Sequence, residues 1–270
     1  MTYVRPNADG IIEPEQVEAA IRPETCLLSV MYANNETGSI QPVAQIGRIA
    51  RGHRIPFHVD AVQGAGLLPL RVDDLGCDLL ALSAHKFYGP KGVGVLYVRR
   101  STPIDWQQEG GGQEGGRRGG TENVPGIVGL AGALTKADAS RPAYVAHCSA
   151  LRDRLEAGIL TAIPDAAING PSDHALRLPN NVNVAVPGVQ GETVLLNLDM
   201  HGVAASAGSA CTTGNSEPSH VLLAMGLGEE RCRESLRFTV GRSNTVEQID
   251  ETVEVLSETV ARVRELAGVG

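Results

Sequence analysis

The chain has 270 residues, of which 42% are hydrophobic and 20% are charged, and a formal net charge of −8. This balance fits one large globular domain or two modest ones, and it excludes an intrinsically disordered chain. With three Phe, one Trp and five Tyr, the acidic chain is a weak candidate for direct binding to nucleic acid.

Membrane and secretory signals are missing from the sequence pattern. No apolar run approaches the roughly 18 residues that a membrane span needs, and the first residues lack the basic-then-apolar order of a signal peptide. The five cysteines are Cys26, Cys77, Cys148, Cys211 and Cys232. An odd, scattered set without a CxxC pair argues against a disulfide framework or a structural zinc site. We expect a cytoplasmic protein that needs no metal.

Short apolar runs alternate with helical patterns in the first half of the chain. Strands are predicted at residues 26–31, 56–60, 79–83 and 94–98. Each run is almost continuously apolar and too short for a helix, whereas residues 42–51 place apolar side chains on one helical face. This alternation indicates a parallel or mixed sheet that is covered on both faces.

After Thr121 the pattern changes to long helices and partly polar strands. Helices are predicted at residues 127–136, 145–160, 192–200 and 246–266, and strands at 181–186 and 235–240. Such a pattern favours a second domain of the α+β type. We therefore predict a first domain over residues 1–138 and a second over residues 139–270.

Two predicted strands end in residues that suggest chemistry. Asp60 closes one apolar strand, and Ser83-Ala84-His85-Lys86 stands where the next one ends. Ligands of open α/β sheets bind beyond the carboxyl ends of the strands. A pyridoxal phosphate enzyme needs such a pair, a lysine for the Schiff base and a carboxylate facing the pyridine nitrogen. A salt bridge between two strand ends, or a solvated surface lysine, would give the same pattern.

Several ordered motifs surround these two residues. They are His58-Val59-Asp60-Ala61-Val62-Gln63, Ser83 to Gly92, Asn34-Asn35-Glu36-Thr37-Gly38, Gly110 to Thr121, and Ser206 to Cys211 followed by Glu217-Pro218-Ser219-His220. Together they closely resemble the cysteine desulfurases of the NifS/IscS type, fold-type I pyridoxal phosphate enzymes of the class V aminotransferase superfamily. The resemblance implies an α/β fold with a partial large domain, built on a mixed, mostly parallel sheet, and a C-terminal α+β small domain.

The resemblance also implies how the cofactor, pyridoxal 5′-phosphate, would be held. Lys86 would form the Schiff base and later move the α-proton of the substrate. Asp60 would face the pyridinium nitrogen, and Gln63 would hydrogen-bond the phenolate oxygen of the cofactor. Ser83 and His85 would donate hydrogen bonds to its phosphate.

Three further residues acquire roles from the same resemblance. Asn35 would lie near the phenolate oxygen and the substrate carboxylate, which Arg237 would bind with its planar fork. Thr121 would reach the phosphate in the partner subunit, so that the active unit would be a homodimer.

Cys211 is predicted to be the nucleophile. It sits in a small, polar stretch with nothing to pack, which is typical of an exposed loop where a thiol stays reactive. Cys26 and Cys77 fit the more common case of a small buried residue. The resemblance implies that Cys211 accepts the sulfur of L-cysteine as a persulfide.

Relative to the family, the chain begins late. The resemblance implies that roughly the first third is absent, with its strands, a Thr-containing turn at the phosphate and a histidine that stacks on the cofactor ring. We expect a fragment of a longer gene product, or a second chain that supplies the rest.

The predicted reaction converts L-cysteine to L-alanine and passes the persulfide sulfur to an acceptor protein, such as an iron–sulfur scaffold. The alternatives are a selenocysteine lyase or another pyridoxal phosphate enzyme of the same fold, and an incomplete, non-catalytic chain that acts as an interaction partner. We expect no direct nucleic acid or membrane partner.

Overall fold

The computed structural model describes residues 1–207 and 217–268, and it divides the chain into two compact units. The unit that we call the sheet unit comprises Ile21–Tyr32 and Val43–Arg141. The unit that we call the C-terminal unit comprises Met1–Ala20, Ala33–Pro42 and Pro142–Gly270.

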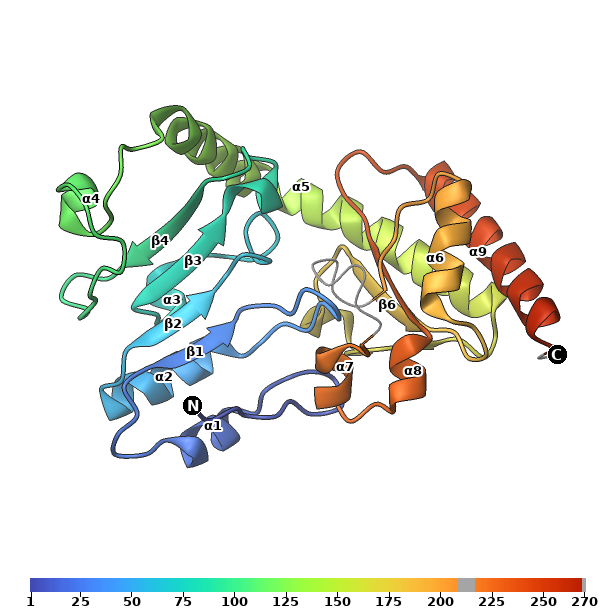
Figure 1. Ribbon diagram of the computed structural model, residues 1–270, viewed down its shortest axis with the longest axis horizontal. Helices are drawn as coiled ribbons and strands as arrows, with labels where there is room; N and C mark the ends of the chain where they lie inside the picture. Colours follow the sequence, from blue (N-terminus) through green and yellow to red (C-terminus); the bar gives the residue numbers. More distant parts are fainter. Residues whose placement is uncertain (208–216, 269–270) are drawn as a thin grey trace. The chain divides into compact units, whose positions relative to one another are not determined.

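The sheet unit is built on four strands in the order β1-β2-β3-β4 (Figure 1). Their bounds are Leu28–Met31 for β1, Phe57–Asp60 for β2, Leu79–Ser83 for β3 and Gly94–Val98 for β4. The strands β1, β2 and β3 run parallel, and β4 is antiparallel to β3. The mixed, mostly parallel sheet of the predicted α/β fold is therefore confirmed.

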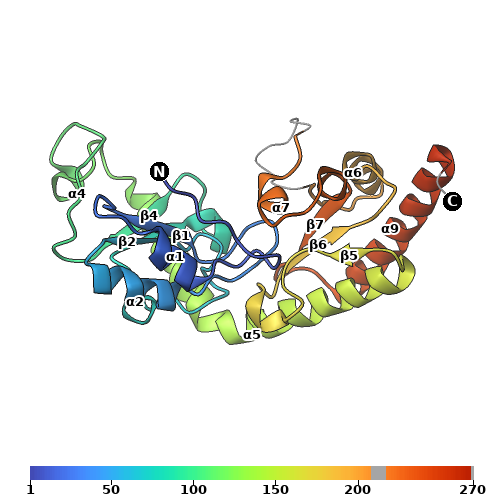
Figure 2. The ribbon, with the colours of Figure 1, turned by 90° about the horizontal axis from the view of Figure 1, so that it is seen from below.

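Helix α2 (Val43–His53) packs against one face of this sheet (Figure 2). Its buried residues Val43, Ile46 and Ala50 recur at helical spacing, as an amphipathic helix requires. The expectation that both sheet faces are covered is wrong for the described residues: burial alternates along β2, and Leu96 of β4 is 50% exposed. In β2 the polar residues His58 and Asp60 occupy the half-exposed face.

The sheet unit also contains shorter elements between and after its strands. They are α3 (Val72–Leu75), the 3₁₀ turn η1 (Ala84–Phe87) and α4 (Gln113–Gly116). The long helix α5 (Val124–Ala162) follows and crosses the division between the two units at residue 142.

The C-terminal unit contains a three-stranded antiparallel sheet in the order β5-β6-β7. The strands are β5 (Ala167–Ile168), β6 (Asn181–Ala185) and β7 (Ser235–Thr239). The helices of this unit, besides the second part of α5, are α1 (Pro14–Ala20), α6 (Gly191–Met200), α7 (His220–Ala224), α8 (Glu229–Arg233) and α9 (Val246–Ala267), with the 3₁₀ turn η2 (His174–Leu176). Apolar side chains of α5, the sheet, α6 and α9 form one buried core.

Helix α5 corrects one prediction from the sequence. Two helices were expected over residues 127–136 and 145–160, but the structure has a single helix of 39 residues that contains Pro142. The intervening residues include three alanines and Arg141, which favour a helix, and the helix continues through Pro142. In contrast, α9 lies close to its predicted range because Thr245 and Gln248 form a capping box and Gly268 closes the helix in a left-handed conformation.

The partition differs from the predicted domains in two segments. Residues 1–20 and 33–42 belong to the C-terminal unit and not to the sheet unit. Within that unit, the Gln41 side chain donates to the Gly10 carbonyl and accepts from the Ile12 amide, and the Leu178 amide donates to the Gly38 carbonyl. These long-range hydrogen bonds carry no signal in the local sequence pattern.

Candidate active site

The carboxyl ends of β2 and β3 bring the first group of predicted site residues together in the sheet unit. Asp60 is the last residue of β2 and pairs in register with Ala81, two residues before Ser83 closes β3. The turn η1 begins directly after Ser83 and carries Lys86 as an exposed residue. Asp60 and Lys86 therefore follow neighbouring parallel strands at the same sheet edge, as predicted from the sequence.

A tight turn fixes the backbone around Lys86. The Gly89 amide donates to the Ala84 carbonyl over 2.8 Å, and Tyr88 adopts a left-handed conformation with φ of 65°. A Cβ atom at Gly89 would lie 2.9 Å from the Ala84 carbonyl oxygen, so this position requires glycine. The motif around Lys86 thus holds η1 in one conformation.

The carboxylate of Asp60 is half-buried and bonded to its own turn. Its Oδ1 atom accepts a hydrogen bond from the Val62 amide over 3.0 Å. His58 lies two residues earlier on the same face of β2, and its Nδ1 atom is 2.9 Å from Ser29 Oγ. Burial lowers the pKa of His58, and the negative charge of Asp60 opposes that shift. Gln63 is half-buried, three residues after Asp60.

Ser83 and His85 contact each other directly. The Oγ atom of Ser83 lies 2.8 Å from Nδ1 of His85. Ser83 is half-buried and His85 is exposed, so solvent reaches both side chains. Thr121 is exposed in the stretch before α5, and among the described residues no hydrogen bond or ion pair joins it to the other predicted residues.

The second group of predicted residues lies in the C-terminal unit, in the turn of residues 34–38, which we call the Asn35 turn. The Asn34 side chain accepts from the amides of Glu36 and Thr37 over 2.8 and 3.1 Å. Arg237, in the middle of β7, donates from Nη1 to the Asn35 carbonyl over 3.0 Å. The two residues predicted to bind substrate are thus in direct contact.

Glu36 is a buried acid in the motif Asn34 to Gly38, and the sequence predicted no role for it. It is 1% exposed, and its Oε2 atom accepts from Ser219 Oγ over 2.5 Å. Its carbonyl accepts from the Asn183 side chain over 3.1 Å. Ser219 also caps α7 by accepting from the Leu222 amide. The partner of Glu36 lies 183 residues away, so the local sequence could not reveal this contact.

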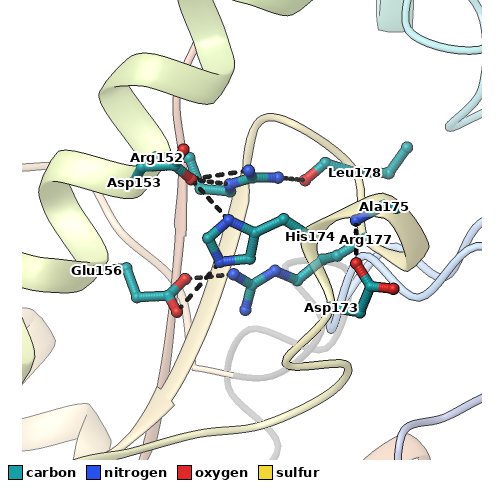
Figure 3. Close-up of polar contacts among 8 residues, drawn as sticks. All are labelled: Arg152, Asp153, Glu156, Asp173, His174, Ala175, Arg177 and Leu178. Atoms are coloured by element: carbon teal, nitrogen blue, oxygen red, sulfur yellow. Dashed lines mark hydrogen bonds and ion pairs between the residues drawn. The ribbon is translucent and has the colours of Figure 1, made fainter.

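Figure 3 shows a cluster of charged side chains that includes Asp153, Glu156, His174 and Arg177. The side chain of Arg177 is fully buried and pairs with Glu156 of α5, and the Cβ of an alanine at Gly38 would lie 3.1 Å from Arg177 Cγ. His174 stands between two carboxylates, with Nδ1 3.1 Å from Asp153 and Nε2 3.5 Å from Glu156. The stem of Arg177 therefore packs directly against the end of the turn.

Cys211, the predicted nucleophile, lies outside the described residues. The described residues on either side of it are bonded to the site. Ser206 and Arg237 exchange backbone hydrogen bonds of 3.0 and 2.6 Å, and Ser219 donates to Glu36. The segment that carries Cys211 thus starts and ends at residues in contact with Arg237 and Glu36.

The four described cysteines differ from one another in exposure. Cys77, Cys148 and Cys232 are buried, and burial raises the pKa of each thiol. Cys26 was expected to be buried in a strand, but it is exposed because β1 starts only at Leu28.

Comparison with known proteins places this chain in a family. The aminotransferase class-V family model matches residues 1–252. The chain is 47% identical over 267 residues to the cysteine desulfurase IscS of Clostridium botulinum, covering 99% of this chain and 67% of that protein. The chain belongs to the cysteine desulfurases of the class-V aminotransferase family.

Other relatives extend this result. The IscS of Anaeromyxobacter dehalogenans is 45% identical over 269 residues, with 99% of this chain and 66% of that protein covered. Among solved structures, a NifS-like protein from Rickettsia africae superimposes with a TM-score of 0.87 at 32% identity, over 96% of this chain and 69% of that one. DndA from Streptomyces lividans gives 0.73 at 39% identity, over 88% and 66%. The chain thus spans about two thirds of the length of these relatives.

Cysteine desulfurases of this family depend on pyridoxal phosphate, use cysteine as substrate and pass its sulfur to acceptors. The described residues fit such a cofactor: an exposed lysine, a carboxylate at the neighbouring strand end and a serine–histidine pair stand at one sheet edge. In the described part of the chain, no helix is long and apolar enough to cross a membrane.

Proposed function

We propose that this chain catalyses the desulfuration of L-cysteine, with Cys211 as sulfur acceptor. The balanced reaction is L-cysteine plus the Cys211 thiol, giving L-alanine and a Cys211 persulfide. The Cβ–S bond of the substrate breaks, a new S–S bond forms at Cys211, and a proton is delivered to the former Cβ atom. The observation that carries the proposal is the placement of Asp60 and Lys86 after neighbouring parallel strands at one edge.

The cofactor would supply an electron sink for the bond changes at the substrate α-carbon. Lys86 is exposed at the sheet edge, where a cofactor could reach it. It would hold the cofactor covalently and move the proton at the α-carbon. The carboxylate of Asp60 would hold a proton on the pyridine nitrogen. Ser83 and His85 would donate to the phosphate, and Gln63 to the phenolate oxygen.

Arg237 and Asn35 would orient the substrate through its carboxylate. The hydrogen bond from Arg237 to the Asn35 carbonyl ties the two residues to one position. The attachments of Ser206 to Arg237 and of Ser219 to Glu36 support a site in which the segment bearing Cys211 is anchored beside these groups.

We further propose a homodimer in which Thr121 serves the partner subunit, and an iron–sulfur scaffold protein as acceptor. The exposed position of Thr121 and its lack of bonds to the other site residues described here support the first point. Similarity to relatives named IscS supports the second, with another thio-modification pathway as the alternative.

The chain offers a sharp test because its lysines are Lys86, Lys91 and Lys136. The purified chain is mixed with pyridoxal phosphate, reduced with borohydride and mapped by mass spectrometry. We expect a label at Lys86, retained in the Lys91→Ala and Lys136→Ala variants and lost in Lys86→Ala. Label spread over all three lysines would contradict the proposed role of Lys86. A Lys86 label without alanine release from cysteine would favour the non-catalytic partner.

The role of Cys211 needs a separate measurement. The Cys211→Ala variant should keep the label at Lys86 but form no persulfide, as detected by alkylation and mass spectrometry. The Cys26→Ala variant is the matched control, because Cys26 is also exposed. Alanine release at the unaltered rate by Cys211→Ala would contradict the nucleophile assignment.

A further inference from the structure

A hollow of about 290 Å³ opens in the sheet unit, at the sheet edge opposite Asp60 and Lys86. Its lining comes from residues just before β2, just before β3 and just after β4. These are the amino ends of two parallel strands and the carboxyl end of an antiparallel one. The hollow is therefore separate from the predicted cofactor edge within the same unit.

Three arginines from two segments line this hollow. Arg51 stands in the last turn of α2, Arg54 follows that helix in a left-handed conformation with φ of 58°, and Arg100 follows β4. All three are exposed, and none of their guanidinium groups forms an ion pair or hydrogen bond with another described residue. In a chain of net charge −8, these three cations gather around one hollow.

The neighbouring Arg99 shows the contrast. It pairs with Asp73 over 2.9 Å and donates to the Cys77 carbonyl over 3.1 Å, so it holds the loop together. Arg99 also lies 3.6 Å from Asp78, the acid that lines the hollow. Because Asp78 further accepts from the Phe57 amide over 3.0 Å, its charge is already compensated.

Helix electrostatics account for only part of this arrangement. A basic residue in the last turn of a helix, such as Arg51, offsets the negative end of the helix dipole. That explanation does not extend to Arg100, which belongs to no helix. A turn closed by the Thr102 amide and the Arg99 carbonyl over 3.0 Å brings Arg100 and Ser101 to the lining.

We propose that this hollow binds the phosphate group of a small phosphorylated metabolite. Guanidinium groups bind phosphate oxygens bidentately, and the hydroxyls of Ser101 and Thr102 add two donors. A carboxylate has only two oxygens and a single charge, so it would match three arginines less well. The volume lies at the lower end of the range for ligand sites, about 300–1,000 Å³, which suits a phosphate with a short organic group.

The experiment titrates the full chain with inorganic phosphate, glycerol 3-phosphate, acetate and glycerol. Backbone amide shifts are followed by NMR at Ile55, Ser101 and Thr102 in the hollow and at His85 and Lys86 on the opposite edge. We expect saturable shifts in the hollow with both phosphates, and none with acetate or glycerol. The variants Arg51→Gln and Arg100→Gln should each weaken binding about tenfold or more.

Arg48→Gln is the matched control, because Arg48 is an exposed residue of α2 that does not line the hollow. It should change the affinity less than about twofold. Equal losses in all three variants, or shifts confined to His85 and Lys86, would overturn the proposal. So would much tighter binding of a 15-nucleotide single strand through the same residues, because the surface would then serve a nucleic acid backbone.

Discussion

The two regions that carry the predicted chemistry differ in exposure and in the sequence separation of their contacts. The edge that bears Lys86 is exposed and is built from residues close together in the sequence. The Asn35 turn is mostly buried, and its contacts reach Asn183, Ser219 and Arg237, which lie far along the chain. Substitutions at the edge should therefore remove chemistry and spare the fold, whereas substitutions at the turn should reduce stability first.

The largest expected effect tests the edge. Lys86→Ala should lower cysteine turnover about ten-thousandfold or more, because it removes both the cofactor attachment and a proton-transfer group. The melting temperature should stay within about 2 °C of the unaltered chain, since the side chain is exposed. Turnover by the Lys91→Ala control should be unchanged. Strong destabilisation by Lys86→Ala would break the contrast between the two regions.

The charge cluster beneath the Asn35 turn gives the next largest effect. Glu156→Gln leaves the fully buried Arg177 guanidinium without its carboxylate and should cost about 3–5 kcal/mol of unfolding free energy. Two nitrogens of Arg177 have no hydrogen-bond partner among the described residues, so little else compensates its charge. Urea unfolding measures the loss. The exposed pair of Arg233 and Glu229 is the control, and Glu229→Gln should cost less than about 1 kcal/mol.

Glu36→Gln probes the turn itself. The substitution weakens the bond from Ser219 and should cost about 1.5–3 kcal/mol, as expected for a hydrogen bond to a charged group. A double-mutant cycle with Ser219→Ala isolates the contribution of the pair. Additive effects in that cycle would mean that the contact does not couple the turn to α7.

Two glycines give a smaller effect of opposite sign. Gly38→Ala should destabilise by about 1–2 kcal/mol, because Gly38 has a φ of 76° and its neighbours Arg177 and Asn181 leave no room for a methyl group. Gly52→Ala, in the helix α2 with open space around it, should stabilise by about 0.5–1 kcal/mol. Thermal unfolding measures the melting temperatures of both variants. Equal melting temperatures would mean that the turn tolerates a side chain at Gly38.

The smallest effect concerns pH and His58. Burial lowers the pKa of His58 in the folded chain, so the folded state favours the neutral imidazole. The stability that this residue contributes is complete above its unfolded pKa of about 6.5 and is lost as the pH falls through the lower folded pKa. Stability measured from pH 7.5 to 5 should fall less steeply in His58→Gln. An unchanged slope would show that other groups dominate.

The two regions also differ in what the sequence could predict. The strands and the placement of Asp60 and Lys86 at neighbouring strand ends follow from local apolar runs and motifs, because each depends on residues nearby in the chain. The role of Glu36 could not be predicted, since its partner depends on tertiary folding. The continuous helix α5 was missed because the predicted boundary between the two domains falls inside it, and the burial of Arg177 because arginine is rarely buried.

The attachments of Ser206 and Ser219 set a limit on sulfur delivery. Cys211 follows Ser206 by five residues and precedes Ser219 by eight. An extended chain spans at most about 3.6 Å per residue, so the chain length alone keeps the Cα atom of Cys211 within roughly 18 Å of the Cα atom of Ser206 and 29 Å of that of Ser219. If Cys211 carries the sulfur, as we propose, an acceptor would have to come within these two limits, so the length of the chain between the two anchors would bound the distance of transfer.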